Sequence, residues 1–108
     1  MNRIERWARN STPIGKAESK YRQYRAYDSE HGFNADEVIP VDEIVRLCYS
    51  EDSKCVYCGC RSELGADRID NTKGHTRDNV VCACRSCNKA RGDSFTYADF
   101  KEITQRYK

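Results

Sequence analysis

The chain has 108 residues, 38% of them hydrophobic and 33% charged, so its length allows one domain with a small apolar core. It has no run of about 18 apolar residues, the length of a membrane-spanning helix, and its first residues lack the apolar segment of a secretory signal. The net charge of +2 conceals an acidic block, residues 28–52 (net −7), between two basic blocks, residues 1–27 (net +5) and 53–108 (net +4). We therefore expect a soluble, cytoplasmic protein without a membrane partner. The basic blocks suit nucleic acid, and a solvated surface of mixed charge explains them equally well.

The N-terminal part is expected to combine a basic arm with a helix. In residues 1–16, Pro13 and Gly15 would interrupt a helix, so this segment is predicted to be arm-like. A helix is predicted over residues 17–31, where aromatic residues recur at helical spacing. These residues are Tyr21, Tyr24 and Tyr27. Packing against the domain body and stacking on nucleic acid both stay open for them.

The later elements alternate between strands and helices. We predict a helix over 41–49 after Pro40, strands over 66–70 and 80–84, a helix over 85–91 ended by Gly92, and a last helix that begins after Thr96. Thr96 is the expected N-cap of that last helix, and Phe95 and Phe100 are expected to form a hydrophobic staple. Phe100, Ile103 and Tyr107 would form its buried stripe.

Four of the seven cysteines form two Cys-x-x-Cys pairs, which indicates a metal site rather than a set of disulfides. The four are Cys55, Cys58, Cys84 and Cys87. The 25 residues between the two pairs are enough for a β-hairpin. A turn, a hairpin and a helix around one ion make a treble-clef-like module, and four thiolates would close a structural Zn²⁺ site. Cys60 and Cys82 are interpreted as filler thiols, although either could stand in for a ligand.

The region from Cys55 to Asp93 resembles HNH (His-Me finger) endonucleases, in particular phage and homing-type members with paired zinc-binding cysteines. The matching pieces are CVYC, DRIDNTKGHT, DNVV and CRSCNKARGD. The resemblance implies a small α+β fold, with a ββα-metal core stapled by zinc and flanked by helices. It divides the chain into a basic arm and helices over residues 1–50 and the HNH core with the last helix over residues 51–108.

The resemblance also implies a second metal site. Asp67 matches the aspartate that binds a catalytic divalent ion, and Asn88 matches the residue that ligates the same ion from the helix. Asn79 matches the central asparagine that holds the loop. Mg²⁺ or Mn²⁺ suits these ligands, since a hard ion prefers oxygen donors and keeps several waters.

The chain departs from the family at Arg68, which stands where most members have the histidine that activates water. Arginine is not a base near neutral pH, so Arg68 would instead clamp the phosphate or stabilise the transition state. His75 and Asp70 are the alternative bases. His75 is also interpreted as an exposed loop residue, and His31 as a helix-capping cation.

DNA is the expected partner, contacted by basic residues of both blocks. Those singled out are Arg22, Arg25, Lys73, Arg77, Lys89 and Arg91. Other basic residues of the arm and the first helix are also expected to contact phosphates: Arg3, Arg6, Arg9, Lys16 and Lys20. The resulting hypothesis is a metal-dependent DNA endonuclease of nicking or homing type from a bacterial or phage-infected cell. The alternatives are a catalytically inactive, zinc-stapled nucleic-acid-binding module and a subunit of a larger phage or repair complex.

Overall fold

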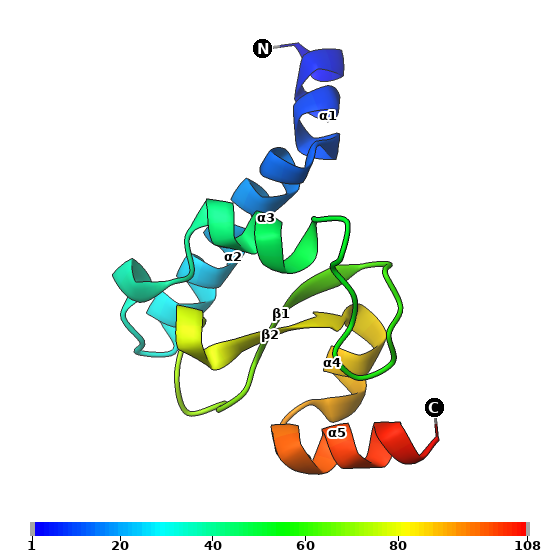
Figure 1. Ribbon diagram of the computed structural model, residues 1–108. Helices are drawn as coiled ribbons and strands as arrows, with labels where there is room; N and C mark the ends of the chain where they lie inside the picture. Colours follow the sequence, from blue (N-terminus) through cyan, green and yellow to red (C-terminus); the bar gives the residue numbers. More distant parts are fainter. Residues whose placement is uncertain (1, 108) are drawn as a thin grey trace.

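The computed structural model describes residues 2–107 (Figure 1). Its elements in chain order are α1 (Arg3–Ser11), α2 (Pro13–Glu30), the short 3-10 helix η1 (Ala35–Glu37), α3 (Val41–Cys48), β1 (Leu64–Arg68), the 3-10 helix η2 (Arg77–Asn79), β2 (Val80–Cys84), α4 (Arg85–Arg91) and α5 (Tyr97–Arg106). The two strands lie between α2 and α3 on one side and α4 and α5 on the other. In the part of the chain that the structure describes, no helix has the length and apolar character to span a membrane.

Residues 3–11 form the helix α1, which has no buried residue, so the expectation that Pro13 and Gly15 would keep this segment from being helical is wrong. Pro13 does not break a helix because it occupies the first turn of α2, where its missing N–H is not needed. The Thr12 side chain caps the same turn by accepting from the amide of Gly15. A Cβ at Gly15 would lie 1.9 Å from the Arg9 carbonyl oxygen, so this glycine lets α1 and α2 meet at a tight corner.

The strands pair as an antiparallel hairpin with Leu64 opposite Cys84 and Arg68 opposite Val80. The first strand begins and ends two residues earlier than predicted. Its end is set by Asp70, whose carboxylate accepts from the amide and hydroxyl of Thr72 and turns the chain into the loop.

Two apolar clusters hold the helices to the hairpin. Ala17, Tyr24 and Ile44 belong to the first, which joins α2, α3 and β1. Tyr57 and Phe100 belong to the second, which lies beside the cysteine turns and anchors α5. The Tyr24 hydroxyl also accepts from the amide of Ala66 at 2.8 Å, so α2 binds the free edge of β1. Packing is thus the role of Tyr24.

The C-terminal elements follow the predicted signals in part. Gly92, with φ of 46°, ends α4, Thr96 caps α5, and the rings of Phe95 and Phe100 pack at 5.7 Å. The predicted stripe is wrong beyond Phe100, because Ile103 and Tyr107 are exposed. Phe100, in the first turn of α5, is the buried residue of this helix, and the later residues of the predicted stripe face solvent.

Candidate metal centre and catalytic cleft

The four predicted cysteines converge on one point. Cys55 and Cys58 lie on a turn before β1, and Cys84 and Cys87 lie at the junction of β2 and α4. Their sulfur atoms are all within 4.8 Å of one another, and those of Cys58 and Cys84 are 3.7 Å apart. A tetrahedral zinc site with bonds of about 2.3 Å requires sulfurs about 3.8 Å apart. The cluster therefore fits a single metal ion.

Local backbone geometry presents these sulfurs. Gly59 adopts φ of 80° and its amide donates to the Cys55 carbonyl, which closes the first turn. The second pair is held by the start of α4, where the Cys84 sulfur accepts from the amide of Cys87. Cys60 and Cys82 are not members of the cluster, as the sequence predicted.

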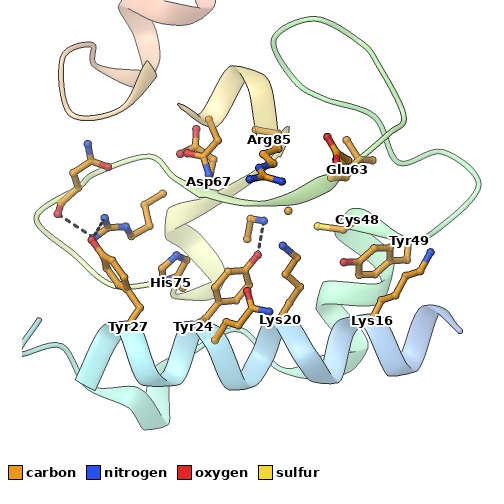
Figure 2. Close-up of a pocket in the computed structure, with 18 of the residues that line it drawn as sticks. Lys16, Lys20, Tyr24, Tyr27, Cys48, Tyr49, Glu63, Asp67, His75 and Arg85 are labelled. Atoms are coloured by element: carbon orange, nitrogen blue, oxygen red, sulfur yellow. Dashed lines mark hydrogen bonds between the residues drawn. The ribbon is translucent and has the colours of Figure 1, made fainter. Parts of the chain in front are cut away.

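A cleft of about 820 Å³ runs along the free edge of β1 (Figure 2). Asp67 and Asn88 both line it, so the structure brings the two predicted ligands of a divalent ion to one cavity. Asp67 comes from β1 and Asn88 from the exposed side of α4. The cleft is closed on its other side by α2.

Asp67 is the best-anchored acid of the cleft. It is 5% exposed and accepts from the Tyr57 hydroxyl at 2.7 Å. The Arg91 guanidinium donates to both carboxylate oxygens at 3.0 Å. Burial raises the pKa of Tyr57, and the hydrogen bond to Asp67 adds to that rise. Tyr57 therefore stays a protonated donor to this carboxylate.

Arg91 does not contact solvent, so its predicted role as a phosphate contact is wrong. It is 2% exposed and uses its whole fork inside the protein. Besides Asp67 it binds three backbone carbonyls, those of Arg68, Ile69 and Phe95. Through these hydrogen bonds Arg91 links α4 to the end of β1.

Arg68 lies on the opposite face of β1, over the ring of Tyr27 at 4.7 Å. Its guanidinium donates to the Tyr27 hydroxyl and to the carbonyls of Asn71 and Lys73, and it lines the cleft. These bonds use three of its five N–H donors. The remaining donors are available to an anion in the cleft.

Asn79 holds the loop between the strands. Its amide nitrogen donates to the carbonyls of Asp70 and Gly74, and its oxygen accepts from the amide of Asp70. The side chain is buried, so these bonds are shielded from water. The loop is thereby fixed relative to Asp67 three residues before it.

His75 is buried, which corrects its interpretation as an exposed loop residue. It is 8% exposed, lines the cleft and binds Asp28 of α2 through two hydrogen bonds. Burial lowers the pKa of His75, against the opposing effect of Asp28. His31, by contrast, is exposed and caps the end of α2, where its Nδ1 contacts the Tyr27 carbonyl.

Besides Arg68, four basic residues line the cleft, and two of them, Lys16 and Lys20, belong to the basic residues of the arm and the first helix that the sequence predicts to contact phosphate. The four are Lys16, Lys20, Arg61 and Arg85. Lys16 and Lys20 are one helical turn apart on the cleft side of α2, a spacing that could have indicated a shared face once the direction of the helix was known.

The other predicted DNA contacts lie outside this cleft. Lys73 and Arg77 line a second hollow of about 790 Å³ beside η1, and Arg77 pairs with Glu43. Arg25 pairs with Asp36, while Arg22 and Lys89 are exposed. The acidic partners lower the positive potential around Arg25 and Arg77.

The chain resembles a known protein in its fold but matches none by sequence. Neither a family model nor a curated protein sequence matches the chain. A solved structure is similar, that of the rare-cutting HNH restriction endonuclease PacI, with a TM-score of 0.68, 17% sequence identity and coverage of 85% of this chain and 76% of that chain. The chain shares its fold with this HNH endonuclease. Within it, β1, β2 and α4 form the ββα core that the sequence predicted, beside the cysteine cluster.

Proposed function

We propose that the protein is a metal-dependent endonuclease that hydrolyses phosphodiester bonds in DNA. One observation carries the proposal: in an HNH fold, a single cleft holds the Asp67 carboxylate and the Asn88 amide under a wall of lysines and arginines. The cations would attract the phosphate backbone. The side-chain oxygens of Asp67 and Asn88 would then lie beside the DNA backbone bound in the cleft.

The cysteine cluster is proposed to hold Zn²⁺ with a purely structural role. Four thiolates fill a tetrahedral zinc site and leave no position for water or substrate. Binding would fasten the turn before β1 to the start of α4, and structural zinc contributes on the order of 10 kcal/mol to small modules. The ion would thus keep Asp67 and Asn88 on one rigid frame.

A second, hard ion such as Mg²⁺ or Mn²⁺ fits the donors of the cleft. A carboxylate offers about four lone-pair positions, and Arg91 and Tyr57 do not use all of those on Asp67. Asn88 is exposed and adds an amide oxygen. When bound, such an ion would neutralise charge on the scissile phosphate and on the leaving oxygen. The free donors of Arg68 would orient the same phosphate.

The proposal is tested by nicking of supercoiled plasmid with Mg²⁺ or Mn²⁺. We expect Asn88→Ala to reduce the rate by at least about 100-fold, because a lost metal ligand removes several kcal/mol of transition-state stabilisation. Ser86→Ala, an exposed change on the same helix, is the matched control and should cut at the wild-type rate. Absence of cutting by the wild-type protein with either ion would refute the proposal.

One pair of observations favours the second candidate, an inactive zinc-stapled module that binds nucleic acid. Arg68 occupies the position of the usual base, and Asp67 is already paired with Arg91. Salt-dependent binding of DNA without any cleavage would support this candidate. A role within a larger phage or repair complex and a cytoplasmic location stay predictions.

A further inference from the structure

Of the two alternative bases that the sequence left open, His75 is the one that lines the cleft. Asp70, the other candidate from the sequence, is committed to Thr72, and these hydrogen bonds lower the pKa of its carboxyl. Asp70 is also absent from the lining of the cleft. A carboxylate held in this way is a weak base and lies in the wrong place.

The imidazole of His75 is oriented by a buried carboxylate. Asp28 is 0% exposed, and its Oδ1 lies 2.7 Å from His75 Nδ1. Its Oδ2 accepts from the His75 backbone amide at 2.8 Å. Both contacts span 47 residues of sequence, from the last turn of α2 to the hairpin loop. An ionised carboxylate can only accept, so the proton of the neutral ring lies on Nδ1.

The remaining ring nitrogen, Nε2, is free of hydrogen bonds within the described residues. His75 stacks on Tyr24 at 4.4 Å and meets the edge of Tyr27 at 5.5 Å, so the ring plane is fixed. Among residues 2–107 no hydrogen bond is made to its Nε2, and no fully buried side-chain nitrogen or oxygen lacks a partner. Nε2 is therefore accessible, and His75 lines the same cavity as Asp67 and Asn88.

We propose that His75 is the general base of the cleft and that Asp28 is the residue that positions it, an inference that rests on the proposed endonuclease function. The Nε2 lone pair takes a proton from water as the water oxygen bonds to phosphorus. The bond from phosphorus to the 3′-oxygen breaks, and that oxygen acquires a proton from solvent. The imidazolium, balanced by Asp28, then returns its proton to solvent.

The charges around the ring suit this role. Asp28, Tyr24 and Tyr27 face it from α2, and Asp67 and Arg68 act on it from β1. Burial is the largest influence and lowers the pKa of His75, Arg68 lowers it further, and Asp28 and Asp67 oppose both. The ring is thus neutral near pH 7 and able to accept a proton.

The first test is the pH dependence of plasmid nicking. For the wild-type protein the rate should rise with pH through the lowered pKa of His75 and level off near neutrality. Asp28→Asn would present an N–H to Nδ1 and move the ring proton to Nε2. We expect it and His75→Gln to lose about 10²- to 10⁴-fold in rate, with this inflection abolished and DNA affinity retained. His31→Gln, at the exposed histidine, is the matched control and should keep both.

The second test does not depend on cleavage or on the variants. Long-range ¹⁵N–¹H correlation spectra of the zinc-loaded wild-type protein, without Mg²⁺, should show His75 protonated on Nδ1 and free on Nε2 above its pKa. The opposite tautomer, or cutting by His75→Gln at the wild-type rate and pH profile, would overturn the inference while leaving the endonuclease intact. A wild-type protein that binds DNA and never cuts it would overturn both.

Discussion

Replacement of Arg91 by methionine tests whether this arginine stabilises the fold rather than contacting DNA. The change keeps an apolar stem of similar length and removes a fork that binds Asp67 and the carbonyls of Arg68, Ile69 and Phe95. Removing one partner of a buried ion pair costs about 3–5 kcal/mol because the other charge is stranded. The three orphaned carbonyls place the loss at the upper end of that range.

The loss is measured by urea unfolding at saturating zinc, since any difference in zinc occupancy would itself shift stability. The control is Lys89→Met, an exposed change on the same helix that should stay within about 0.5 kcal/mol of the wild type. Adding Asp67→Asn to Arg91→Met removes the stranded charge and should restore part of the loss. Equal stability of the two variants would refute the burial argument, and weaker DNA binding by Arg91→Met would then restore its predicted role as a phosphate contact.

Two further predictions address the metal and the cleft. Removal of zinc by a strong chelator should unfold the hairpin and α4, because the cysteine cluster holds their junction. Circular dichroism should then show a loss of secondary structure that added Zn²⁺ restores. A native spectrum after zinc removal would contradict a structural role for the ion. Lys20→Ala should reduce the slope of log binding constant against log salt concentration for duplex DNA by about 0.9. Lys101→Ala on α5, outside the cleft, is the control and should leave this slope unchanged. Equal slopes for both variants would exclude Lys20 as a phosphate contact.

The features that the sequence predicted correctly are governed by local rules. The two Cys-x-x-Cys turns identify the members of the metal cluster because each pair needs only its own turn to converge. Gly92 and Thr96 identify the ends of helices because capping depends on a few neighbouring residues. The ββα core follows once these turns and caps are placed in order.

The sequence predictions that were wrong or incomplete concern residues whose contacts lie far away in the sequence. Arg91 resembles any basic residue at the end of a helix, and only its contact with Asp67, 24 residues away, reveals that it is buried. Asp28 lies in an acidic block and gives no local sign that it meets His75. The sequence around Gly15 indicates a break in a helix. The structure shows instead that Gly15 lets two helices meet at a corner, because the Arg9 carbonyl lies beside it.

The same long-range contacts bear on the predicted division at residue 50, which stays a prediction. The division follows the sequence pattern, since the cysteines and the matched motifs all lie in residues 51–108. The cleft does not follow it: α2 supplies Tyr24 to the edge of β1 and Asp28 to His75. Zinc would hold Asp67 and Asn88 without α2, but the ring of His75 would lose the carboxylate that fixes its tautomer. The proposed metal site and the proposed general base thus depend on different parts of the fold, and only the proposed metal site lies within the ββα core.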